Sequence, residues 1–138
     1  MEIDKERLKD SGGRPLTQSL FLEFGYNTDF AVYTWADEDK LYKGTVYPSL
    51  KRLFLAEEDP TEYRFSKKYL LGWSHWQRLN ANKALRIHFD DWRDELEIYI
   101  RSQGLRSIID MSEDNFQAAK YLAEKGWEKN RVMSKVCQ

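Results

Sequence analysis

The 138-residue sequence predicts a mainly α-helical protein with one β-hairpin, in which a helix-turn-helix-like domain precedes a long-helix hairpin that acts as an oligomerisation core. Three observations lead to this fold class. From residue 49 onward, apolar residues recur at helical spacing between glycines and prolines that end helices. Residues 30–47 instead have the alternation and the β-branched and aromatic content of strands. The hydrophobic content of 41% is enough for a packed core, while charged residues at 33% indicate exposed helix faces.

The first third of the chain is expected to hold an arm, a short helix and the hairpin. Residues 1–13 are polar and end in Ser-Gly-Gly, so we predict a mobile N-terminal arm. The run SLFLEFGY follows from residue 19, with Leu20, Phe21 and Phe24 at the spacing of a short amphipathic helix that Gly25 would end. In the hairpin at 30–47, the polar run 37–40 is the predicted turn. Because two strands alone are marginal in water, this hairpin must pack on helices.

Helices fill the rest of the predicted structure. Ser49 is a suitable cap for a helix that ends before Asp59-Pro60, and a second helix continues from the proline to Gly72. Ser74 is the expected cap of a third helix, which completes a helical domain at 14–82.

A helical hairpin is predicted for 83–127, followed by a polar tail at 128–138. Its first helix ends at Gly104 and carries an apolar seam with spacings of 4, 3, 4 and 3 residues. Its second helix carries an apolar stripe and ends at Gly126. The predicted oligomerisation residues are those of the seam, Leu85, Phe89, Trp92, Leu96 and Tyr99, and those of the stripe, Phe116, Ala119 and Ala123. The pattern leaves open whether the seam is buried within one chain or between chains.

Few residues could support catalysis or metal binding. Cys137 is the only cysteine, His75 and His88 have no partners at metal-ligand spacing, and there is no glycine-rich phosphate loop. We therefore predict no catalytic site, no metal and no cofactor. A small nuclease that uses Asp90 and Asp94, which share a helix face, is an alternative.

Without a signal peptide or a membrane-length apolar run, the protein is expected to be cytoplasmic, with no membrane partner.

The strongest functional signal is a local excess of positive charge. Residues 61–88 carry six Lys or Arg against one acid, although the whole chain has a net charge of −1. A basic patch on a near-neutral chain indicates a nucleic-acid surface, and we expect double-stranded DNA as the partner. Base-edge contacts would come from the second helix, and phosphate contacts from the helices around it. The predicted DNA-binding residues are Arg64, Lys67, Lys68, Ser74, His75, Gln77, Arg78, Lys83 and Arg86. Alternatively, the basic side chains merely coat a core helix.

The order of these parts resembles the small terminase subunits of tailed bacteriophages. The helix-turn-helix sequence TEYRFSKKYLLGWSHWQRL is followed by a long helix and by an AAKxLxxKGW-like run at 118–127. The resemblance covers about residues 60–127, but the hairpin at 30–47 is not a usual part of that pattern. The resemblance implies a non-catalytic subunit that recognises viral DNA and forms a homo-oligomeric ring in the host cytoplasm. It also implies that this subunit regulates the large terminase subunit, which is an ATPase and nuclease.

Two other functions remain compatible with the same residues. A dimeric transcription regulator would use the same helix-turn-helix on one palindromic site. A phage accessory module that binds another protein would instead depend on exposed aromatic residues such as Trp35, Tyr47 and Trp73.

Overall fold

The computed structural model describes residues 3–24 and 28–128. The chain divides into two compact units, Met1–Leu96 and Glu97–Gln138, which are described separately below. The described part is mainly helical with one two-stranded antiparallel hairpin, which confirms the predicted mixture of elements. The boundary between the units falls inside the longest helix, rather than at residue 83.

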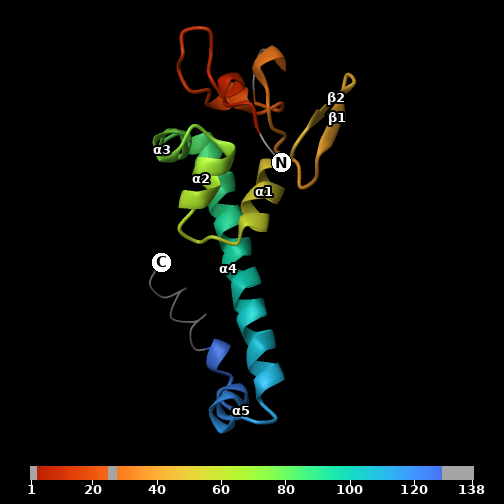
Figure 1. Ribbon diagram of the computed structural model, residues 1–138, viewed down its shortest axis with the longest axis vertical. Helices are drawn as coiled ribbons and strands as arrows, with labels where there is room; N and C mark the ends of the chain where they lie inside the picture. Colours follow the sequence, from red (N-terminus) through yellow and green to blue (C-terminus); the bar gives the residue numbers. More distant parts are fainter. Residues whose placement is uncertain (1–2, 25–27, 129–138) are drawn as a thin grey trace. The chain divides into compact units, whose positions relative to one another are not determined.

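Four helices build the first unit. They are α1 (Leu50–Glu57), α2 (Tyr63–Tyr69), α3 (Trp73–Asn80) and the N-terminal part of α4 (Lys83–Met111). The side chain of Ser49 accepts a hydrogen bond from the Arg52 amide at 3.1 Å, which confirms the predicted cap of α1. Gly72 precedes α3 as its N-cap, so Ser74 lies within the first turn and does not cap the helix. In Figure 1, α1, α2 and α3 surround the beginning of α4.

The core of the first unit is strongly aromatic. Trp76 stacks at an angle on Phe89 with ring centroids 4.7 Å apart, and meets Phe65 edge-on at 5.1 Å. Tilted and edge-on ring pairs of this kind add stabilisation beyond the area they bury. Further fully buried side chains from every part of the unit complete this core: Leu8, Leu20, Phe21, Tyr33, Leu50, Phe54, Leu70, Leu79 and Leu85.

The hairpin is shorter than predicted and turns at a different place. Its strands are β1 (Lys40–Tyr42) and β2 (Thr45–Tyr47), with Leu41 paired to Val46. The two-residue turn is Lys43-Gly44, and both residues have positive φ, 49° and 79°. This is the geometry that a tight hairpin needs, and the glycine adopts it without strain. The predicted turn at 37–40 is therefore wrong.

Residues 30–36 form no strand with the hairpin. They follow the one-turn helix η3 (Thr28–Phe30) and contact other segments through single bridges, Tyr33 with Phe21 and Thr34 with Ser49. The Asp39 carboxylate instead organises this region. It accepts hydrogen bonds from the Ser49 amide at 2.8 Å and from Arg52 at 3.0 and 3.1 Å. The Ser49 amide bond, followed by the contacts of Arg52, holds the pKa of Asp39 below its usual value although burial opposes the shift.

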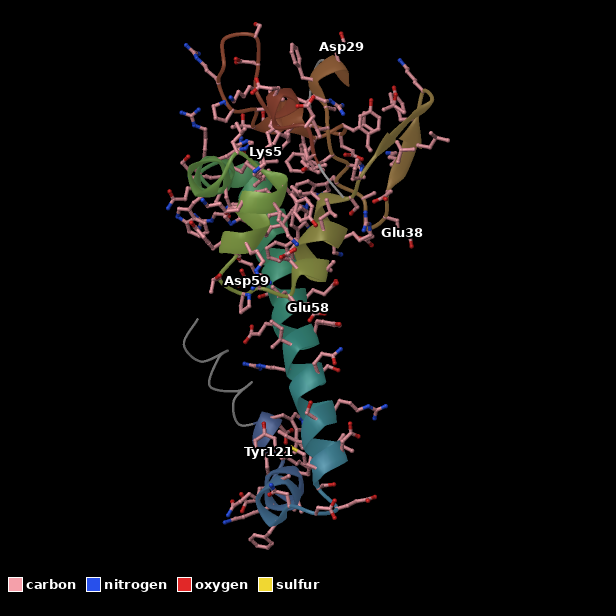
Figure 2. All side chains as sticks on the ribbon, in the orientation of Figure 1. Lys5, Asp29, Glu38, Glu58, Asp59 and Tyr121 are labelled. Atoms are coloured by element: carbon pink, nitrogen blue, oxygen red, sulfur yellow. The ribbon has the colours of Figure 1, made fainter. Side chains whose placement is uncertain are left out.

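The N-terminal residues fold onto the first unit, where the sequence predicts a mobile arm. Residues Lys5–Leu8 form the one-turn helix η1, and Leu8 is fully buried. The Leu16 amide donates to the Leu8 carbonyl at 2.9 Å, and Lys5, labelled in Figure 2, donates to the backbone carbonyl of Lys67 in α2. Where the sequence predicts a short helix from residue 19 to Gly25, the described residues form only the single turn η2 (Gln18–Leu20).

The second unit contains the C-terminal part of α4 and the helix α5 (Phe116–Ala123). α4 passes through Gly104 without interruption, so the predicted stop there is wrong. The Asn115 side chain caps α5 by accepting from the Ala118 amide at 3.1 Å. Beyond α5, Gly126 lies so close to the Tyr121 ring that an added Cβ would come within 2.1 Å of it. Residues 129–138, most of the predicted tail, lie outside the described residues.

None of the described helices combines the length and the apolar composition needed to cross a membrane.

Candidate nucleic-acid interface

Eight of the nine predicted DNA-binding side chains are exposed, and all eight belong to the first unit. They come from α2, α3 and the first turn of α4, with buried residues between them at helical spacing. We call this set the basic surface: Arg64, Lys67, Lys68, Ser74, Gln77, Arg78, Lys83 and Arg86. On α3, the exposed residues Ser74, Gln77 and Arg78 follow the i, i+3, i+4 spacing of one helix face. Trp76 and Leu79 point into the core instead.

His75 does not belong to the basic surface, contrary to the prediction. Its side chain is 1% exposed, and both ring nitrogens have partners. Nδ1 lies 3.2 Å from the Leu71 amide, which donates to it, so the ring must donate from Nε2 to the Leu16 carbonyl at 2.7 Å. Burial lowers the pKa of His75, with a hydrogen bond to Leu16 that opposes and the charge of Arg78 that adds to the shift. This histidine joins the N-terminal segment to the turn before α3.

Several cations of the basic surface already have partners. The Glu57 carboxylate lies 3.2 Å from Lys68 Nζ and 3.8 Å from Arg64 Nε, and its side chain is only 8% exposed. Arg86 makes a looser, exposed contact of 3.9 Å with Asp90. Within the described residues, Lys67, Arg78 and Lys83 form no ion pair, so their charges are the least neutralised of the set.

The start of α4 also has a hollow beside these cations. It measures about 280 Å³ and is lined by Lys83, Arg86, Ile87 and Asp90. Ile87 is 65% exposed and forms an apolar wall between the charges. The hollow therefore offers two cations and one carboxylate to a ligand.

A hydrogen-bond network around Glu62, which the sequence did not predict, connects the helices that carry the basic surface. Glu62 is the one acid of the 61–88 stretch, and it is 8% exposed. It accepts from Trp76 Nε1 at 2.8 Å and from Arg93 Nε at 2.6 Å and a terminal Arg93 nitrogen at 2.9 Å. Arg93 also donates to Asn80 at 2.7 Å and to Asp90 at 2.9 Å. The bond to Glu62 is the main cause of the raised Arg93 pKa.

This network connects the three elements that carry the basic surface. Glu62 is the residue before α2, Trp76 and Asn80 belong to α3, and Arg93 belongs to α4. Arg93 thereby pairs with Glu62 in another part of the chain as well as with Asp90 on its own helix. Spacing along one helix shows only neighbours on that helix, so sequence could not reveal a partner 31 residues away.

The predicted oligomerisation seam is largely an internal core. Leu85, Phe89, Trp92 and Leu96 are at most 3% exposed within a single chain, so these four residues are corrected from interface to core. The seam is apolar because α4 covers the other elements of its own unit. Trp35, an expected exposed aromatic residue, packs on this seam with its ring 5.0 Å from Trp92.

The second unit leaves large apolar side chains in solvent. Tyr99 and Phe116, two of the predicted oligomerisation residues, are 40% and 77% exposed. On α5, Ala118 is buried, whereas Ala119 is half-buried and Ala123 is exposed, so the inward stripe differs from the predicted one. The exposed apolar side chains of this unit are distributed along α4 and at the start of α5, and we refer to them together as the apolar patch: Ile98, Tyr99, Ile109, Met111 and Phe116.

Carboxylates do not converge into a metal site in the described residues. No group of three or more His, Cys, Asp or Glu side chains lies close enough there to hold a metal ion. Asp90 is paired with Arg93 at 2.9 Å and with Arg86 at 3.9 Å, and Asp94 is exposed. Asp90 is thus oriented by arginines rather than by another carboxylate.

Comparison with family models, curated proteins and solved structures gives no match for this chain.

Proposed function

We propose that this chain is a non-catalytic DNA-binding subunit of a phage DNA-packaging terminase, which recognises viral DNA and regulates the large ATPase and nuclease subunit. The observation that carries the DNA-binding part is the basic surface. Eight polar or cationic side chains from consecutive elements face solvent, and the only acid among them in sequence, Glu62, is turned inward to Trp76 and Arg93. Such an arrangement keeps Glu62 away from a surface that would approach phosphates and leaves Glu57 and Asp90 as the acids beside its cations.

The proposed docking uses α2 and α3 as a helix-turn-helix. The two helices are joined by the short segment 70–72, and the exposed side of α3 presents Ser74, Gln77 and Arg78. In this motif the second helix enters the major groove, where Gln can recognise adenine and Arg can recognise guanine. Lys67 and Lys83 would contact phosphates on either side and fix the register.

The terminase assignment adds assembly and a protein partner to DNA binding. It draws on the resemblance of residues 60–127 to small terminase subunits. The apolar patch of the second unit favours association with further copies, because exposed apolar surface of this kind is characteristic of interfaces. A ring would repeat the basic surface around the DNA, so modest contacts would add up by avidity.

DNA affinity measured against salt concentration tests the proposal. We expect fluorescence anisotropy to show duplex binding that weakens steeply with salt, and Lys83→Ala to reduce the log–log slope by about 0.9. Arg78→Glu should abolish binding at moderate salt. Lys43→Glu, in the turn of the hairpin, is the matched control and should leave affinity nearly unchanged, because the hairpin and α3 lie on opposite sides of α1 in Figure 1.

Two results would reject the proposal. A wild-type chain that ignores duplex DNA at low salt rules out the DNA-binding function. A chain that binds one palindromic site strictly as a dimer indicates a transcription regulator instead, so native mass with and without DNA accompanies the affinity measurement.

A further inference from the structure

Two exposed aromatic rings lie next to each other within the basic surface. Tyr63 is the first residue of α2 and Trp73 is the first residue of α3. Their ring centroids are 6.2 Å apart, with an angle of 48° between the ring planes. Tyr63 is 53% exposed and Trp73 is 38% exposed. The turn between α2 and α3 thus brings together two rings that are ten positions apart in the sequence.

These rings differ from the other aromatic side chains of the helical part of the first unit. Phe54, Phe65, Trp76 and Phe89 are all at most 2% exposed and belong to the core. Tyr63 and Trp73 instead each leave more than a third of their surface in contact with solvent. An aromatic pair that remains in solvent is typical of a binding surface, since a ligand can still cover it.

Positive charge surrounds the pair. Lys67 Nζ lies 5.4 Å from the centroid of the Tyr63 ring, one helical turn further along α2. Arg64 and Lys68 are exposed on the same helix. Ser74 and Arg78 follow Trp73 on α3. Arg64 and Lys68 share the Glu57 carboxylate, so Lys67 and Arg78 are the unpaired cations near the rings. Their charge favours an anionic ligand that also has flat apolar groups.

We propose that Tyr63 and Trp73 form a stacking platform for unpaired bases of single-stranded DNA, with Lys67 at an adjacent phosphate. This inference builds on the proposed DNA-binding function and extends it to a second form of DNA. A base inside a duplex has both faces covered by its neighbours, whereas an unpaired base can stack on a side chain. Binding of single strands commonly combines aromatic stacking with a cationic groove, and each stacked base contributes a substantial part of the affinity.

The test compares a fluorescent oligothymidylate, an abasic oligomer of the same length and a duplex, all at the same salt concentration. We expect Trp73→Leu and Tyr63→Leu each to weaken oligothymidylate binding about tenfold. Neither change should alter binding of the abasic oligomer. Trp73→Phe and Tyr63→Phe keep a ring and should retain most of the affinity, which separates stacking from a general effect on folding. Duplex affinity should change less than twofold in all four variants.

Tyr42→Leu is the matched control. Tyr42 is 37% exposed, and Lys43 Nζ lies 5.3 Å from its ring centroid, so it reproduces the Lys–Tyr pair on the hairpin. It should leave all three affinities unchanged.

Three outcomes overturn the platform. The first is a wild-type chain that binds the duplex but not oligothymidylate, which leaves the proposed function intact. The second is an abasic oligomer that binds as tightly as oligothymidylate. The third is an equal loss of duplex and single-strand binding in the Leu variants, which would make the rings part of the duplex site. A chain that binds none of the three ligands rejects the proposed function together with the platform.

Discussion

Gly72 is the residue at which α2 gives way to α3, and its backbone has φ of 117° and ψ of −169°. This region of backbone space is accessible almost only to glycine, because a side chain would clash there. Glycine signals such as this one made the break between the two helices predictable from sequence. Gly104 shows the limit of that signal, because α4 continues through this glycine. Its position does not require a glycine either, since an added Cβ would meet nothing within 4 Å.

We expect Gly72→Ala to lower the free energy of unfolding by about 1–3 kcal/mol, because alanine is strained at this φ and ψ. Gly104→Ala is the matched control. It should raise helix stability by roughly 0.5–1 kcal/mol, because an added Cβ there meets nothing within 4 Å and alanine favours the helix. Urea unfolding followed by circular dichroism measures both. A Gly72→Ala variant as stable as wild type would contradict the inferred backbone constraint.

The buried His75 gives the first unit a pH-dependent stability. Burial lowers its pKa in the folded state, while the unfolded pKa remains about 6.5. Below that value the unfolded chain binds a proton that the folded chain does not, so stability is complete above about pH 6.5 and decreases as the pH falls. The slope reaches at most about 1.4 kcal/mol per pH unit.

Urea unfolding between pH 5.5 and 8, followed by tryptophan fluorescence, measures this loss. In His75→Gln the slope around pH 6 should flatten. Equal slopes in wild type and His75→Gln would show that other groups cause the pH dependence.

At the scale of elements, the Glu62 network determines how α2, α3 and α4 pack. Glu62 adopts a left-handed backbone conformation, with φ of 68°, directly before α2. Glutamate adopts this conformation rarely, and here its carboxylate is held by Trp76 and Arg93. The hydrogen bonds of the Glu62 side chain to α3 and α4 thus offset the backbone strain at this residue.

We expect Arg93→Met to destabilise the chain by about 1–3 kcal/mol, because it leaves a nearly buried carboxylate with one donor. The double variant with Glu62→Gln should recover part of that loss, since no charge then remains without its partner. Arg86→Met removes an exposed pair and should cost less than about 1 kcal/mol. Chemical denaturation of wild type, the single variants Glu62→Gln and Arg93→Met, and the double variant gives the coupling energy between the two residues. Additive effects of Glu62→Gln and Arg93→Met would contradict the network.

At the scale of the whole molecule, the two units expose different surfaces. The first unit has a dense aromatic core and the basic surface, whereas the second has a small core and the apolar patch. We therefore expect self-association through the second unit. The joint variant Ile98→Ser and Phe116→Ser should shift the native mass to that of a monomer in analytical ultracentrifugation.

Leu41→Ser is the control for this experiment. Leu41 is 70% exposed on the hairpin of the first unit, so its replacement should leave the assembly unchanged. A wild-type chain that sediments as a monomer at all concentrations would contradict the inferred interface.

Local sequence patterns were sufficient for most of the helical framework. Ser49 as a cap, Gly72 as a break and the apolar spacing of α4 depend on interactions within a few residues, so the sequence alone determines them. The exposure of Lys67, Arg78 and Lys83 follows from the same periodicity. The hairpin was harder, because both 37–40 and Lys43-Gly44 have turn residues, and only the pairing of Leu41 with Val46 distinguishes them.

Only the tertiary structure decided what covers each apolar or polar side chain. Periodicity identifies the apolar side of α4, but the burial of Phe89 and Trp92 depends on segments far away in sequence. His75 lies four residues before Leu79 and shares the buried side of α3, but only the tertiary structure supplies the Leu16 carbonyl that pairs with its ring there. The sequence by itself thus determined where helices form and that positive charge gathers on them. Long-range contacts determined which of those residues remain at the surface, because burial depends on the whole chain rather than on neighbouring residues.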